Sequence, residues 1–296
     1  MNILLNFLKA RDRSKALNAS PSPPRTPLEG RNPTALEWPR ARWWREREGQ
    51  LPHHAITARG RGEARRAGVC LFLVACGCLG LVEIIFRKPL PELHPIPATT
   101  PEVAYVAGAT LSVLALAGIA RVRGARLALA IYWSFAVVLT FIAALKEPSN
   151  PLSWVPMSKA ALFAIAALVA AGAIRGRRLQ ISLGAVLIFY GVIHLVFHDL
   201  IAELIPRWFP KGAIWSYFTG PLMLVAGAAL VADRAASEMA LAVAALFSSW
   251  ILIIHLGRLA AHSGSSFEWT FALSALALVD VALMAVSPDP PGEPPD

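Results

Sequence analysis

The chain is poor in charged residues, which excludes an ordinary soluble domain. Charged residues make up only 16% of its 296 residues, whereas soluble globular domains carry roughly 25%. Hydrophobic residues reach 56%, and the mean hydropathy is +0.53. We therefore expect the chain to lie in a lipid bilayer.

Cysteines and the short motifs of soluble enzymes are also scarce. Cys70, Cys76 and Cys78 all fall in one apolar segment, where we interpret them as small packing residues. They form neither a disulfide framework nor a zinc-binding spacing. The chain has no nucleotide-binding loop, nucleophile elbow, zincin motif or Cys-x-x-Cys-His. We expect no metal site, and the sequence leaves open whether the chain is an enzyme.

Eight segments rich in Ala, Leu, Val and Ile make up most of the chain. A helix of about 16–20 such residues can cross the roughly 30 Å of hydrocarbon in a bilayer. Only helices and closed barrels satisfy their own backbone hydrogen bonds in lipid. The pattern predicts an all-α polytopic membrane protein with about eight transmembrane helices. The segments cover 68–86, 103–120, 127–145, 157–174, 179–197, 213–232, 239–257 and 267–286.

These segments contain an internal repeat. The run Gly80–Phe86 is echoed by Gly191–Phe197, with Glu83 and His194 standing 111 positions apart. Tyr105 and Tyr217, each three residues before a glycine, stand 112 apart. A Glu-Leu-x-Pro run also occurs in both halves, at 92–95 and 203–206. The spacing predicts two tandem four-helix repeats, over residues 68–174 and 179–286.

The segments outside the repeats are polar. Residues 1–67 are rich in Arg, Pro and Ser, which is typical of a disordered basic tail, and residues 287–296 form an acidic, Pro-rich tail. The net charge of +9 lies mainly in the first tail and in short loops, which favours contact with anionic lipid over nucleic acid. A start codon assigned too far upstream would also explain the first tail, so its place in the native protein stays open.

Short arginine-rich loops predict the orientation. Cytoplasmic loops of membrane proteins carry an excess of Lys and Arg. Here arginines follow the second, fourth and sixth apolar segments, and the basic tail precedes the first. We therefore place both termini in the cytoplasm. The loop arginines are Arg121, Arg123, Arg126, Arg175, Arg177, Arg178 and Arg234.

Polar residues in hydrocarbon are the best functional clue, because they are costly there. In this orientation several lie near the outer interface at similar depth: His194, His198, Tyr217, His255, Arg258 and Glu268. The simplest interpretation is that each histidine bonds a neighbour or a lipid head group. The first alternative is a site where a histidine exchanges protons with a quinone head group. It requires only a histidine near a carboxylate and a cation at the lipid boundary, which is a less exact arrangement than a metal site. Haem or a metal ion between His194 and His255 is a third interpretation, with less support.

The first repeat carries a different set of charges. Glu83 occupies the position of His194, and Lys146 and Lys159 lie where His255 and Arg258 lie later. A salt bridge from Glu83 to Lys146 or Lys159 is the simplest interpretation, and a proton path is the alternative. Asp280 is a further isolated carboxyl, for which we expect a hydrogen bond inside the bundle.

The second repeat resembles the DoxX-like family of bacterial membrane proteins. The resemblance rests on Tyr190–His194, Ala202–Trp208, Ile214–Gly220, His255–Arg258 and Phe267–Phe271, and a fainter copy covers 68–174. It implies a four-helix unit per repeat, an inner-membrane location and a link to quinone-dependent redox chemistry with a partner subunit. The recurring histidine of the family maps onto His194, and its later His and Arg onto His255 and Arg258. Because Glu83 replaces the histidine in the first repeat, only the second is expected to be active.

Three functions stay open at this point. The first is a DoxX-like protein supporting quinone-linked redox chemistry at the outer face of the membrane. The second is a small-solute transporter, with Glu83 or Asp280 lining a cavity between the repeats. The third is a non-catalytic scaffold for a partner enzyme. Assembly with a redox partner subunit or as a homo-oligomer is open in each case.

Overall fold

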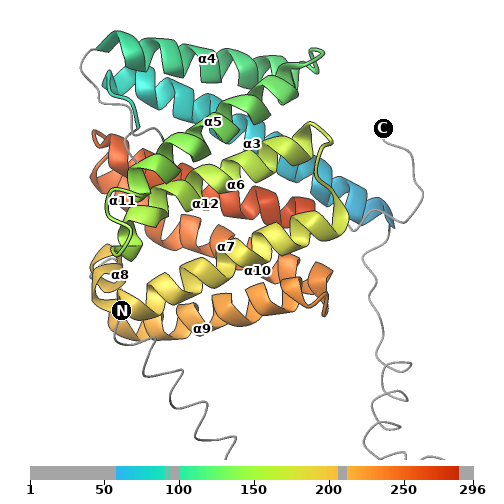
Figure 1. Ribbon diagram of the computed structural model, residues 1–296, viewed down its shortest axis with the longest axis vertical. Coiled ribbons are helices and arrows are strands. Elements are labelled where there is room, and N and C mark those ends of the chain that lie inside the picture. The colour runs from blue at the N-terminus through green and yellow to red at the C-terminus, as the bar shows by residue number, and fades with distance from the viewer. Residues whose placement is uncertain (1–57, 91–92, 94–100, 206–211, 287–296) are drawn as a thin grey trace, which may run out of the picture. The chain divides into compact units, whose positions relative to one another are not determined.

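The computed structural model describes residues 58–90, 93, 101–205 and 212–286 (Figure 1). The predicted tails over 1–57 and 287–296 lie outside these residues. The long helices are α3 (Ala58–Phe86), α4 (Pro101–Ile119), α5 (Ala125–Ala144), α6 (Val155–Ala170), α7 (Gly176–Val196), α9 (Gly212–Val231), α10 (Ala236–Trp250) and α12 (Ser266–Ala285). The short ones are η1 (Pro151–Trp154), α8 (His198–Leu204), η2 (Ile251–His255) and α11 (Leu256–Ala261).

Eight helical stretches in the described part of the chain are long and apolar enough to cross a membrane. They include the continuous stretch Ala236–Ala261, which joins α10, η2 and α11. Large apolar side chains point outward, such as Ile85 at 69% and Val106 at 67% exposure, as expected where lipid covers the surface. The predicted all-α fold with eight membrane-crossing helices is confirmed, and the protein is a multi-pass integral membrane protein.

The first helix begins earlier than the sequence predicted. Residues 58–67 were expected to belong to the disordered tail, but they form the first turns of α3. This segment is built from Ala, Arg and Glu, which are good helix formers and outweigh its two glycines. Arg66 Nε donates to the carbonyl of Gly62 at 3.4 Å. The helix therefore continues beyond the apolar segment into a charged stretch.

Consecutive long helices pack as antiparallel pairs. α3 packs along α4, α5 along α6, α7 along α9, and α10 along α12, while α12 also packs along α3. Because successive helices run in opposite directions (Figure 1), the chain turns alternately at two ends. We call one the arginine end, with turns at 120–124, 171–175 and 232–235, and the other the aromatic end, with turns at 145–154 and 262–265.

Glycines bring two of these pairs into close contact at matching positions. A Cβ on Gly80 of α3 would collide with the carbonyl of Gly108 on α4. A Cβ on Gly191 of α7 would lie 2.8 Å from the carbonyl of Gly220 on α9. Small residues at a crossing let two membrane helices approach each other closely. Both contacts use the glycines of the predicted repeat, although the duplication itself stays a prediction.

A buried aromatic pair holds α3, α5 and α6 together. Trp133 of α5 stacks on Phe163 of α6 with centroids 4.4 Å apart, and its Nε1 donates to Cys76 Sγ of α3 at 3.4 Å. Cys76 is thus a buried packing residue, as predicted. Cys70, for which packing was also predicted, is exposed instead.

Candidate functional site

A π-helical turn shapes the end of α10. Over Ile251–His255 the helix widens, and the N–H of Leu256 bonds to the carbonyl of Ile251, five residues back. π-helical turns are rare in proteins, and those that occur often lie at functional sites. His255 is the last residue of this turn, and α11 continues from it toward the aromatic end.

An ion pair joins α11 to the start of α12. Arg258 Nε donates to Glu268 Oε2 at 2.8 Å, and its second nitrogen, Nη2, donates to Oε1 at 2.5 Å. The Glu268 side chain is only 7% exposed and that of Arg258 25%. A two-pronged contact of this kind fixes the guanidinium plane. The pair therefore holds the turn containing His255 against α12.

A lysine from the first half of the chain reaches the same place. Lys159 of α6 is buried, and its Nζ lies 3.9 Å from the centroid of the Phe271 ring of α12. The His255 ring lies 6.3 Å from Phe271 on the same helix. We call Lys159, His255, Arg258, Glu268 and Phe271 the α12 rim site.

One atom of this site stands out. The Nδ1 atom of His255 is buried and makes no hydrogen bond to any described protein group. Buried polar atoms in native proteins are nearly always hydrogen-bonded, and an exception needs an explanation. A ligand that hydrogen-bonds to the imidazole would supply one.

The other predicted histidines have partners of their own. His194 Nδ1 lies 2.8 Å from the carbonyl oxygen of Tyr190, and its ring stacks on Trp250 with centroids 6.1 Å apart. His198 Nε2 lies 3.3 Å from Asp199 Oδ1, and its ring lies 4.8 Å from that of Tyr217. Each contact matches the simplest interpretation of these residues. A haem or metal between His194 and His255 stays the least supported alternative. The described residues contain no group of three His, Cys, Asp or Glu able to hold a metal ion.

The predicted intramembrane charges lie at several places. Glu83 is fully buried on α3 and accepts a hydrogen bond from the N–H of Leu90 at 3.1 Å. Lys146 is exposed just after α5. Asp280 is fully buried on α12, nearer the arginine end. The Glu83–lysine salt bridge stays a prediction.

Sequence reasoning missed part of the α12 rim site. Phe271 was not singled out, although it lies three residues after Glu268 and hence on the same side of a helix. Lys159 was noticed but was assigned to the charges of the first repeat. Its place beside Phe271 depends on the packing of α6 on α12, for which the sequence carries no clear signal.

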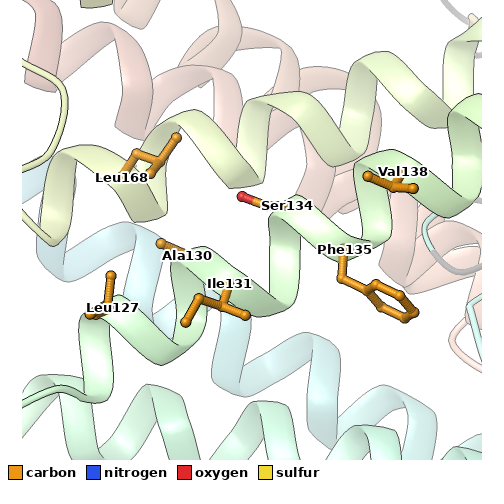
Figure 2. Close-up of a pocket in the computed structure, with 7 residues that line it drawn as sticks. All are labelled: Leu127, Ala130, Ile131, Ser134, Phe135, Val138 and Leu168. Carbon is orange, nitrogen blue, oxygen red and sulfur yellow. The ribbon is translucent and has the colours of Figure 1, made fainter.

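A shallow groove elsewhere on the molecule is apolar. It has a volume of about 370 Å³ and lies between α5 and α6 (Figure 2), and Ser134 is the one polar residue among those lining it. The others are Leu127, Ala130, Ile131, Phe135, Val138 and Leu168. None of them belongs to the α12 rim site, and a lipid-facing groove of this composition offers little for chemistry.

Comparison of the chain with family models, with curated proteins and with solved structures finds no match. The side chains of the α12 rim site therefore carry the functional interpretation by themselves.

Proposed function

We propose that this protein is a DoxX-like integral membrane protein that binds a quinone head group at the α12 rim site. In this proposal the chain consists of two tandem four-helix units in the bacterial inner membrane, with both termini in the cytoplasm. The aromatic end then faces the outer side. The observation that carries the proposal is the buried, unpartnered Nδ1 of His255 beside Phe271.

The surroundings of His255 favour a ligand that arrives from the lipid. Leu252, three residues before His255, is 66% exposed, and Leu256, directly after it, is 49% exposed. In a membrane-spanning helix such side chains contact acyl chains. The polar groups of the site therefore lie within a helical turn of the hydrocarbon. A molecule with a polar head and a long apolar tail matches this arrangement better than a water-soluble metabolite.

The side chains suit the chemistry of a quinone. A neutral imidazole nitrogen either donates a hydrogen bond to a quinone carbonyl or accepts one from a quinol hydroxyl. The Phe271 ring beside His255 supplies an aromatic contact for a planar head group. Reduction of a quinone to a quinol takes up two electrons and two protons. In the proposal a partner redox subunit supplies the electrons, and water at the aromatic end supplies the protons, one of them through His255.

The transporter alternative has less support. It requires a water-accessible cavity lined by Glu83 or Asp280, but both residues are fully buried. Neither lines the groove between α5 and α6. The scaffold alternative predicts a stable complex with a soluble redox protein and no quinone binding, so the same purified protein distinguishes it from the proposal.

Tryptophan fluorescence tests the proposal, because Trp250 lies near the site, five residues before His255. The purified full chain in lipid nanodiscs is titrated with a short-tailed benzoquinone, with empty nanodiscs correcting for partitioning. Loss of one hydrogen bond to the imidazole weakens binding by about 1.4 kcal/mol, which is tenfold. We expect His255→Ala to raise the dissociation constant by about this factor.

His262→Ala is the matched control, because His262 is exposed at the end of α11. It should bind as the wild type does. Quenching that does not saturate, or equal binding by both variants, would overturn the proposal. Co-purification of a soluble redox protein without quinone binding would favour the scaffold instead.

A further inference from the structure

A buried carboxyl lies away from the α12 rim site, near the arginine end. Asp280 is on α12, five residues before the helix ends, and its exposure is 0%. Neither of its carboxyl oxygens makes a hydrogen bond to a described protein group. The N–H of Val281 is close to it, but belongs to the same helix. No other helix among the described residues supplies the predicted hydrogen bond inside the bundle.

The backbone of α12 at Asp280 lies against α3. A Cβ built on Gly68 of α3 would lie 2.6 Å from the carbonyl oxygen of Asp280 and 2.9 Å from Met284. Cys76, also on α3, is buried in the same core. Several apolar residues of α12 in this region, Val279, Val281 and Ala282 among them, belong to the buried core.

We propose that Asp280 is a proton-binding site in the membrane interior, occupied by a proton in the resting protein. A carboxylate transferred into an apolar environment without a partner loses many kcal/mol of solvation. Such a group needs a cation or a proton. Ionisable groups within membrane helices commonly serve in proton transfer. Asp280 gives the second half of the chain one group that can bind and release a proton. The inference is independent of quinone binding.

The surroundings of Asp280 distinguish a proton from a metal cation. Sites for hard cations gather about six oxygen ligands. Asp280 belongs to no group of three His, Cys, Asp or Glu among the described residues. A single buried carboxyl without a second acidic neighbour can hold a proton but supplies only two of the ligands that an ion such as sodium needs.

Infrared spectroscopy with selective labelling tests this directly. The full chain is made by cell-free synthesis with aspartate carrying ¹³C at its side-chain carboxyl, and is reconstituted into lipid in neutral buffer. Among the aspartates of the chain, only Asp280 falls within one of the eight spans. We expect one isotope-shifted carbonyl band of a carboxylic acid, which is lost in Asp280→Asn and is unchanged when sodium replaces potassium.

The control is Asp233→Asn at an exposed position of the arginine end, where Asn tolerates the positive φ of 57°. It should remove only carboxylate absorption. If the wild-type label shows carboxylate bands alone, or if sodium converts the acid band to a carboxylate band, the proposal is wrong. Because the wild-type spectrum decides the outcome, the test holds even if Asp280→Asn fails to fold.

Discussion

Individual side chains at the aromatic end act as a connected group. Lys159, Phe271 and His255 lie beside one another, and the Arg258–Glu268 pair holds α11 against α12. Arg258 and Glu268 were predicted to lie at similar depth because of their positions at helix ends. That they are partners could not be predicted from the sequence. A π turn adds one residue to the helix before α11 and so rotates the side chains that follow it. Without knowing of that turn, a reader of the sequence would place Arg258 on the wrong side of α11 to reach Glu268.

The ion pair should matter for stability. Removing one partner of this part-buried pair leaves a charge without its hydrogen bonds, which costs about 1.5–3 kcal/mol. We expect Glu268→Gln to lower the thermal unfolding temperature of the purified protein in detergent. The double variant Arg258→Gln with Glu268→Gln should recover part of the loss, because no lone charge remains. Equal melting of Glu268→Gln and the wild type would show that the pair contributes nothing.

The helices themselves were largely predictable. Lipid forces the backbone to satisfy its own hydrogen bonds, so each long apolar stretch becomes a helix, and all eight predicted segments do. Two features escaped prediction. The charged start of α3 resembles a disordered tail in composition, and its helix continues from the apolar stretch beyond it. The choice of neighbours, such as α12 on α3, was hidden because lipid-facing and protein-facing sides of these helices are both apolar.

The close glycine contacts make a prediction about helix pairing. Adding a methyl group to Gly80 or to Gly191 should push two helix backbones apart, and overpacking of this kind destabilises by about 1–3 kcal/mol. We expect Gly80→Ala and Gly191→Ala to lower the unfolding temperature in detergent by similar amounts. Similar effects in both halves would support the duplicated geometry.

Gly257→Ala is the matched control for these variants. A Cβ at this α11 position would meet nothing within 4 Å, and alanine is better than glycine in a helix by about 0.5–1 kcal/mol. This variant should be neutral or slightly more stable. Loss of stability in Gly257→Ala, or none in the other two, would contradict the packing described here.

The molecule as a whole has two chemically distinct ends. The turns at the arginine end carry Arg121, Arg123, Arg175 and Arg234, whereas the α12 rim site and its aromatic neighbours lie at the other end. The sequence predicted this separation from loop charges alone. It did not predict that Lys159, from the first half of the chain, lies in the α12 rim site of the second half. That position depends on the packing of α6 on α12.

Labelling in intact cells tests the orientation. In a chain whose three cysteines are replaced by serine, Ser263→Cys places a thiol at the aromatic end and Arg123→Cys at the arginine end. Both positions are exposed. By the excess of arginine in cytoplasmic loops, a membrane-impermeant maleimide should label the first in intact cells and the second only after permeabilisation. The reverse pattern would place the α12 rim site on the cytoplasmic side.

Photochemical cross-linking of a quinone tests the central claim most directly. Membranes containing the full chain are illuminated with an azido-quinone, and the modified peptides are identified by mass spectrometry. We predict modification within η2, α11 or the first turns of α12. Excess unlabelled quinone should suppress it, and His255→Ala, but not His262→Ala, should strongly reduce it at a quinone concentration near the wild-type dissociation constant. Modification spread over lipid-facing residues such as those of the α5–α6 groove, and unaffected by competitor, would contradict the account.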